Sequence, residues 1–399
     1  MKSNRAVSYE LEDMKIAAAE LAKAADGFPL LKNSMGVLYF SLGLNAEKLM
    51  AEIKKLLPFD IMGCSTDAVL DGKTGMNEFS SSLIILTADD CDFHFFVSEP
   101  FGPGNIKRRG VEVCEKAMSG AAKDAKLVLL NLPFNDELLL NDLPDSFHEA
   151  TGGKPVFGGC SGFDHDRGYS AVLFNEAVYT DRFVCCFISG GVCPVFSVMG
   201  QFSSIAKKSN VVTKSESNVI YTVDDMSFVD YLESLGIATS FSDEFASGFL
   251  LGSIVIKAKW GDSAEDSGVY FVLQKLNQED GSGVFGCRIP QGSQINVTSC
   301  KNDDMEISTQ ICMYSLLEKM REAEPAGYTY STILCGSCST RYIYMFPSKD
   351  IEGNVIKKYN PPDMNFMGYY TSGEICPVSV KDGHVLNRAH NATITMCAF

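Results

Sequence analysis

The 399-residue chain predicts an α+β protein in which mixed β-sheets are flanked by helices in two domains. Strand-like and helix-like stretches alternate, and two short apolar runs end in the same tripeptide. Phe59–Met62 lead into Gly-Cys-Ser at 63–65, and Pro155–Gly158 lead into the same residues at 159–161. Each run follows a helix-like stretch and an earlier strand-like stretch. We therefore expect each tripeptide where a β-α-β crossover delivers its second strand, the edge at which open α/β sheets bind ligands.

The first half of the chain predicts alternating helices and strands. Tyr9–Ala25 shows helical spacing and closes at a glycine, which favours a docking helix outside the main domain. A strand at Val37–Leu42 precedes a helix that Asn45 caps and Pro58 stops. Two β-rich runs then predict a hairpin. These runs are Leu83–Thr87 and Phe93–Val97, and the elements that follow are a helix at Lys107–Ala122, a strand at Lys126–Leu132, a partial helix at Asp136–Ala150, and strands at Tyr169–Phe174 and Val178–Ile188.

The second half is richer in strands. We expect a domain boundary near Gly236, which gives an N-terminal helical extension (1–35), a first domain (36–236) and a second domain (237–399). The predicted elements of the second domain are strands at Phe249–Lys259, Val269–Lys275, Gly283–Ile289 and Gln294–Ser299, a helix at Met305–Arg321, and strands at Thr332–Leu334, Arg341–Phe346 and Ala392–Ala398. Loops of both domains are expected to converge on a ligand site.

Charge and composition narrow the classes of partner. A net charge of -16 and a pI near 4.8 disfavour nucleic acid and anionic membranes as main partners, which leaves a small molecule or another protein. No apolar run approaches the ~20 residues of a membrane span, and the first residues do not form a secretory signal. The fourteen cysteines lie mostly within apolar runs, as buried thiols do in a reducing compartment. The expected location is cytoplasmic.

A third small-residue segment follows the predicted strand at 332–334. Cys335 and Cys338 have the spacing of a redox pair or of half a zinc site. A zinc site needs four ligands, and His384 and His390 lack a short paired spacing, so no metal is expected. A thioredoxin-like motif should open a helix, whereas Arg341–Phe346 predicts a strand. No glycine-rich nucleotide fingerprint is present, so no cofactor is expected.

Three motifs each allow a ligand-binding and a structural interpretation. Gly63–Thr66 could cradle an anion with backbone N–H groups, or form a tight turn in which the hydroxyls cap backbone groups. Arg341, inside an apolar stretch, meets either a buried carboxylate of the protein or the carboxylate of a ligand. Glu374, in a small-residue loop between aromatic residues, binds an amino group or is the internal partner of Arg341. These alternatives remain open in the sequence.

Conventional catalysis has little support. None of the five histidines stands in a recognised arrangement with a serine or cysteine nucleophile, and Asp164-His165-Asp166 is typical of a solvated loop. We therefore expect no catalytic residues. The competing hypothesis is a cysteine-dependent enzyme or thiol switch that uses Cys64 or Cys338.

Taken in order, several motifs resemble the FIST family. They cover nearly the whole chain from Gly36: Gly63–Thr66, Pro155–Gly159, Phe174–Glu176, Val212–Ser215 with Asp224, Cys338 with Arg341, Tyr370–Ile375 and His390–Thr393. The resemblance implies an N-terminal and a C-terminal FIST module that form one sensory unit for small ligands such as amino acids. It also implies a separate signalling partner, because no output domain follows in this chain. Asp67–Val69 departs from the family, which commonly has a glycine soon after the Ser-Thr pair.

The leading hypothesis is a cytoplasmic sensory protein for signal transduction, with Arg341 binding a carboxylate and Glu374 an amine. A protein-interaction scaffold is a further alternative, and the sequence carries no signal of oligomeric state. The predicted ligand-binding residues are Gly63, Cys64, Ser65, Thr66, Gly158, Gly159, Cys160, Ser161, Cys338, Arg341, Tyr370, Glu374 and Asn391.

Overall fold

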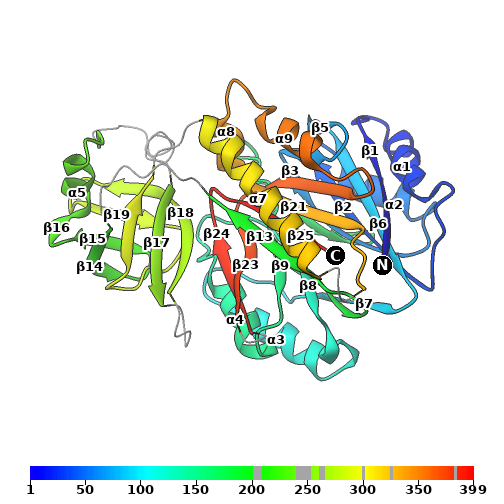
Figure 1. Ribbon diagram of the computed structural model, residues 1–399, viewed down its shortest axis with the longest axis horizontal. Coiled ribbons are helices and arrows are strands. Elements are labelled where there is room, and N and C mark those ends of the chain that lie inside the picture. The colour runs from blue at the N-terminus through cyan, green and yellow to red at the C-terminus, as the bar shows by residue number, and fades with distance from the viewer. Residues whose placement is uncertain (201–208, 240–252, 260–265, 299–301, 324–326, 382–383) are drawn as a thin grey trace.

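A three-sheet core and a β-barrel make up the computed structural model (Figure 1). It describes residues 1–200, 209–239, 253–259, 266–298, 302–323, 327–381 and 384–399. The sheets contain both parallel and antiparallel pairs, and helices pack against them, so the predicted α+β class with mixed sheets is confirmed. Within the described residues, no helix is both long and apolar enough to cross a bilayer.

Each sheet of the core has six strands. In spatial order, the first contains β1 (Lys2–Ser8), β6 (Ser81–Ala88), β2 (Asn33–Ser41), β3 (Asp60–Thr66), β10 (Val172–Phe174) and β11 (Ala177–Tyr179). The second contains β7 (Cys91–Val97), β12 (Val184–Gly190), β8 (Leu127–Leu132), β9 (Val156–Cys160), β23 (Glu374–Lys381) and β24 (His384–His390). The third contains β13 (Val195–Met199), β25 (Ile394–Ala398), β21 (Thr332–Cys338), β22 (Asn365–Thr371), β4 (Ala68–Asp71) and β5 (Gly75–Glu78).

The three sheets follow one plan and interlock. The two middle strands are parallel in every sheet: β2 with β3, β8 with β9, and β21 with β22. After the second parallel strand, the chain leaves its sheet and adds a hairpin to another one. Hairpin β4–β5 passes from the first sheet to the third, β23–β24 from the third to the second, and β10–β11 from the second to the first. The core is therefore a cyclic threefold repeat, and the sharing of hairpins brings the ends of β3, β9 and β22 together.

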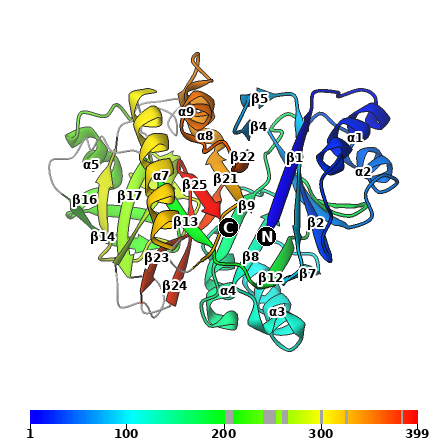
Figure 2. The same ribbon diagram turned by 45° about the vertical axis from the view of Figure 1, so that its right-hand side comes forward.

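Helices connect the strands of each repeat. The described helices are α1 (Met14–Ala22), η1 (Lys23–Ala25), α2 (Ala46–Ile53), α3 (Ile106–Met118), η2 (Ala121–Asp124), α4 (Asp142–Thr151), α5 (Phe228–Ser234), α7 (Asn302–Ala323), α8 (Ser339–Tyr344) and α9 (Ile351–Tyr359). Helix α2 begins at its Asn45 cap, whose side chain accepts a hydrogen bond from the Lys48 N–H, as the sequence predicts. Figure 2 shows α1 and α2 together beside the first sheet and α7 beside the third.

The barrel is inserted between β13 and α7 of the third repeat. Its strands, in spatial order, are β14 (Asn210–Glu216), β20 (Gln294–Val297), β17 (Ser253–Lys259), β18 (Asp266–Asn277), β19 (Ser282–Phe285), β15 (Val219–Val223) and β16 (Met226–Ser227). Because β14 pairs with both β20 and β15, the sheet closes. The barrel contains strands from both sides of Gly236.

The first 35 residues belong to the core, so the prediction of a docking helix outside the main domain is wrong. Strand β1, which the sequence reasoning missed, pairs with β6 along its whole length. Helix α1 buries Met14, Ala17, Ala18 and Leu21 in a cluster that it shares with α2. Apolar burial fixes this segment to the first sheet.

Two further predictions are wrong for a common physical reason. The runs at 83–87 and 93–97 do not form a hairpin, because β6 is buried and already lies between β1 and β2; β7 pairs with β12 instead. The stretch at 341–346 is not a strand: helix α8 covers most of it. Both edges of β21 are occupied, by β22 and β25, so this sheet offers a following strand no place beside β21.

Candidate ligand-binding site

The ends of the three second strands meet at the centre of the core. The Gly162 N–H donates to the Ser65 carbonyl (2.7 Å), the Thr66 hydroxyl donates to the Tyr370 carbonyl (2.9 Å), and the Thr371 hydroxyl donates to the Cys160 carbonyl (2.7 Å). The two predicted tripeptides thus lie at one junction, together with the end of β22. They are buried, and all but Ser161 are strand residues rather than an open loop.

The glycines of this junction serve close strand contact. Gly63 pairs with Leu38, and Gly158 pairs with Leu130. A Cβ on either glycine would collide with the carbonyl oxygen of its partner. The structural counterpart of Gly63 is therefore Gly158 and not Gly159, so the two matching tripeptides are offset by one residue.

The two hydroxyls of Gly63–Thr66 are occupied by the backbone. Ser65 Oγ lies within hydrogen-bond distance of the carbonyls of Gly162 (3.2 Å) and Ala171 (3.3 Å), and the Thr66 hydroxyl shares its single proton between the carbonyls of Ala68 (2.8 Å) and Tyr370. Ser161 Oγ lies 2.5 Å from Ser170 Oγ. The bonds of Ser65 and Thr66 correspond to the structural interpretation of Gly63–Thr66, in which hydroxyls satisfy backbone groups.

A cavity of about 450 Å³ opens beside this junction, between the core and the barrel. Core residues that follow the ends of β8, β9, β21, β22 and β24 form one side, and β18 and β19 of the barrel form the other. The lining residues are Phe134, Asn135, Asp136, Leu138, Leu140, His165, Val272, Leu273, Gln274, Lys275, Val284, Cys338, Ser339, Thr340, Ile343, Ser372 and Asn391. Of the predicted site residues, Cys338 and Asn391 are among them.

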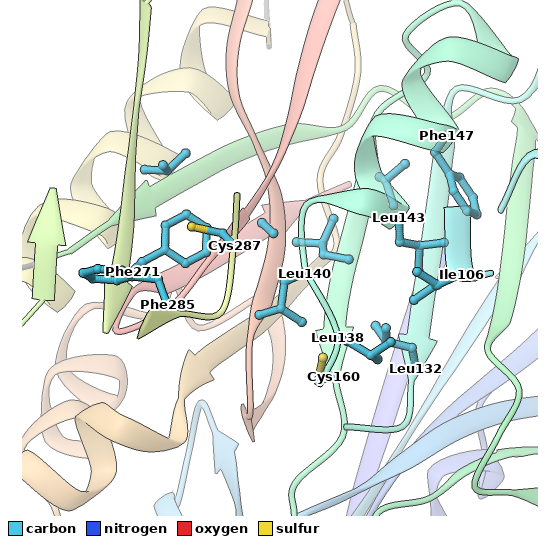
Figure 3. Packing of buried hydrophobic residues seen from close by; sticks show 14 of the residues in the cluster. Ile106, Leu132, Leu138, Leu140, Leu143, Phe147, Cys160, Phe271, Phe285 and Cys287 are labelled. Atoms are coloured by element: carbon cyan, nitrogen blue, oxygen red, sulfur yellow. The ribbon is translucent and has the colours of Figure 1, made fainter. Parts of the chain in front are cut away.

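The cavity has an apolar floor and a charged rim. Leu138, Leu140, Leu273 and Cys338 are buried. Figure 3 shows Leu140 on the side of the core nearest Phe285 of the barrel, and Leu138 beside Leu132. The half-buried Ser372 and Asn391 add polar groups to the floor. The exposed residues of the rim are Asp136, His165, Gln274 and Lys275. This combination suits a small ligand with an apolar body and polar ends.

Backbone hydrogen bonds hold the barrel against the floor. The Asn391 N–H donates to the Tyr270 carbonyl (2.7 Å), and the Leu140 N–H donates to the Gly286 carbonyl (3.0 Å). No hydrogen bond of the Asn391 side-chain amide or the Ser372 hydroxyl is found within the described parts of the chain. Both groups are therefore available to a ligand.

One wall of the cavity carries a hydroxyl–carboxyl pair. Ser339 Oγ donates to Asp67 Oδ2 at 2.6 Å. Burial raises the pKa of the Asp67 carboxyl, while the Ser339 hydrogen bond and the charge of His165 act in the opposite direction. Asp67 stands where the sequence departs from the family pattern, so this departure lies against the cavity wall.

Glu374 lies directly beneath the floor. Its Oε2 accepts hydrogen bonds from the Thr393 N–H (3.2 Å) and hydroxyl (2.7 Å), and the Cys338 N–H donates to the Thr393 carbonyl (2.9 Å). Among the described residues, Oε1 has no oxygen or nitrogen donor. Burial raises the pKa of the carboxyl to about 8, and the hydrogen bonds from Thr393 and the Cys338 side chain only partly oppose this rise.

Arg341 does not line the cavity, and the expectation that it binds a ligand carboxylate needs correction. Its guanidinium is fully buried and forms an ion pair with Glu352 at 2.6 Å, and it also donates to the hydroxyls of Ser308 (2.9 Å) and Thr309 (3.1 Å). Tyr370 Oη donates to the same Glu352 carboxylate (2.9 Å). The internal partner is thus Glu352, not Glu374. The sequence reasoning missed α9, the helix that carries Glu352.

The buried thiols at the junction are poor nucleophiles. Burial raises the pKa of the Cys338 thiol to about 12 and holds that of Cys64 well above its ordinary value; it also raises the pKa of Cys160. A thiolate nucleophile needs a lowered pKa. In the portion of the chain that the structure describes, no group of three or more His, Cys, Asp or Glu side chains could hold a metal ion. The Cys335–Cys338 pair lies within β21 and ahead of a helix, rather than ahead of the predicted strand.

Sequence reasoning missed most of the cavity wall. Phe134–Asp136 follow the end of β8, so the rule that places ligands at the ends of parallel strands could have found them. Nothing in the sequence marks Val272–Lys275, because only the docking of the barrel brings this strand over the core.

Comparisons with known proteins agree with the resemblance. The FIST N domain matches residues 34–226, and the FIST C domain matches residues 230–377. No curated protein sequence matches the chain. Among solved structures, cyanuric acid hydrolase from A. caulinodans has a TM-score of 0.36 at 7% identity, covering 99% of this chain and 98% of that chain. A chorismatase has a TM-score of 0.35 at 6% identity over 100% of both chains. Likeness at this level carries no functional argument.

Proposed function

The chain belongs to the FIST family, whose domains are sensory domains for small ligands, and on this premise we propose that it binds a small ligand in the cavity between core and barrel. The observation that carries the proposal is that residues of both FIST modules line the cavity. Residues 134–165 fall within the FIST N match, and residues 272–284 and 338–372 fall within the FIST C match. A ligand in this cavity would touch both modules at once, as a single sensory unit requires.

The proposed ligand is an amino acid or another small carboxylate. The cavity volume of about 450 Å³ lies within the range of small-molecule sites. Lys275 and His165 at the rim can attract a carboxylate, which replaces the role expected of Arg341. Leu138, Leu273 and Val284 can bury an aliphatic body.

We place this sensor in the cytoplasm and couple it to a separate signalling protein. All cysteines in the described parts of the chain are free, and most are buried, which suits a reducing compartment. Ligand binding to the two modules would then be reported through that partner.

Binding is favoured over thiol catalysis. The raised pKa values of Cys64 and Cys338 support this choice, since both thiols stay protonated near neutral pH. Alkylation rates measured across pH test the alternative. Fast alkylation of either cysteine below pH 7 would favour the enzyme.

A thermal-shift screen with amino acids and small carboxylates tests the proposed cavity. A ligand present at 100 times its Kd should stabilise the folded state by about 2.7 kcal/mol. Ser372→Phe fills the floor of the cavity and should abolish the shift. The matched control is Ser119→Phe, on the exposed surface after α3, which should retain it. A shift that survives in Ser372→Phe would contradict this site, and the absence of any shift with the whole screen would favour a scaffold.

A further inference from the structure

Resting on the proposed ligand-binding function, we propose that the floor of the cavity is a subsite for a protonated amine, and that Glu374 loses its own proton when the amine binds. Nothing in the family assignment specifies such a subsite. The proposal starts from the position of Glu374 relative to the two polar floor residues, Ser372 and Asn391.

Both polar floor residues adjoin the carboxyl group through the backbone. Ser372 and Gly373 form the turn between β22 and β23, and Glu374 is the first residue of β23. Across the ladder, Glu374 pairs with His390, the residue before Asn391. A Cβ at Gly373 would contact Leu140 and the Asn391 side chain, which shows how closely this turn lies under the floor. Only floor residues therefore separate Glu374 from the cavity.

The subsite offers acceptors that match an ammonium group. A primary ammonium has three N–H donors and no acceptor. Asn391 Oδ1 and Ser372 Oγ can each accept one of them. The buried Glu374 carboxyl behind them can supply the balancing negative charge, because Thr393 occupies only Oε2 and leaves Oε1 without an oxygen or nitrogen donor among the described residues. A carboxylate ligand at this floor would instead face Glu374 itself.

The surroundings of Glu374 keep the empty site neutral. Its carboxyl is 0% exposed, and burial raises its pKa to about 8, so the protonated form dominates at neutral pH. His390 on the paired strand is also neutral, since burial lowers its pKa to about 3. In the described part of the chain, the other titratable or charged groups that interact electrostatically with Glu374 include the thiols of Cys160, Cys335, Cys338 and Cys376 and the guanidinium of Arg341.

The second acid near the cavity is already engaged. Asp67 accepts the Ser339 hydrogen bond and has His165 nearby as a source of positive charge. Among the described residues, the cation that acts on Glu374 is Arg341, which is committed to Glu352. An incoming ammonium would supply that charge and favour the carboxylate. The ligand keeps its three amine protons, and the carboxyl proton of Glu374 passes to the buffer.

Calorimetric titration in two buffers of different ionisation enthalpy tests this exchange. The probes are methylammonium, L-leucine and 4-methylpentanoate, which is leucine without its amine, at pH 6.5. In the wild-type protein, methylammonium and leucine should release close to one proton, and 4-methylpentanoate none. Leucine affinity should also rise about tenfold from pH 6 to pH 7, because proton release is linked to binding.

Two variants separate the subsite from general attraction of cations. Glu374→Gln has the shape of the neutral carboxyl and should fold; it should abolish proton release, weaken methylammonium and leucine at least tenfold, and leave 4-methylpentanoate unchanged. Glu137→Gln makes the same change at an exposed acid that does not line the cavity, and it should leave proton release intact.

Each outcome supports or overturns the proposal. Proton release that persists in Glu374→Gln, equal affinity for leucine and 4-methylpentanoate, or failure of methylammonium to bind would overturn the amine subsite. In any of those cases, the proposed ligand-binding function would still stand if wild type binds 4-methylpentanoate and Ser372→Phe does not. Failure of all three probes would contradict both.

Discussion

The core and the barrel reach closure by opposite routes. In the core, each sheet receives a hairpin from another repeat, so the first sheet depends on β10 and β11 of the second repeat, far along the chain. In the barrel, the described strands between Asn210 and Val297 form one antiparallel sheet that closes on itself. A destabilising substitution in the core should therefore affect all three sheets, whereas one in the barrel should affect the barrel alone. The cavity lies where the two regions meet.

The buried ion pair of the core should give the largest effect. Arg341→Met leaves the fully buried Glu352 without its cation and should cost about 4 kcal/mol of unfolding free energy in urea denaturation. The matched control is Lys349→Met, which breaks a partly exposed pair with Glu78 and should cost less than about 1 kcal/mol. Equal costs would contradict the structural role of Arg341.

Glu374 should make the core less stable as pH rises. Its folded pKa lies near 8, above the ordinary value of 4.5, so the native state binds more protons than the unfolded state between these values. Stability is then fully present below about pH 4.5 and is lost as pH rises through 8, by an amount on the order of 3 kcal/mol. Denaturation of wild type and Glu374→Gln from pH 5 to 8 measures this loss. A slope that is equal in both proteins would assign the loss to other groups.

Replacing a closely packed glycine by alanine should destabilise the core more than the barrel. At Gly63 an added Cβ meets the Leu38 backbone, which cannot move without shifting β2, so Gly63→Ala should cost about 3 kcal/mol. At Gly283 of the barrel it meets the Phe228 ring, a buried side chain rather than a paired backbone, so Gly283→Ala should cost less, about 1 kcal/mol. Thermal unfolding of both variants provides the comparison. A larger loss at Gly283 would reverse the proposed order of rigidity.

The interface between the regions should show the smallest effect on stability. Arg288 pairs with Asp142 of α4 at 2.5 Å but is about half exposed, so Arg288→Ala should cost less than about 1 kcal/mol. We expect it instead to speed hydrogen exchange in β18 and β19, where the barrel contacts the core. Unchanged exchange rates there would mean that the backbone bonds of Asn391 and Leu140 hold the interface by themselves.

Local patterns were sufficient for part of the fold. The β-α-β crossovers before Gly63 and Gly158, the helix at 305–321 and the Asn45 cap follow from periodicity and capping, and the structure confirms them. The ordered motifs were also enough to indicate the family. Each of these features depends on residues that are close in sequence.

By itself, the sequence determined the α+β class, the crossovers and the family, because short-range spacing encodes them. The tertiary structure alone decided that β6 and β7 lie in different sheets, that Arg341 meets Glu352, and that Val272–Lys275 cover the cavity floor. The physical reason is competition for partners. A strand edge, a buried charge or an apolar floor is satisfied by whichever segment the fold brings to it, and only the assembled chain establishes which segment that is.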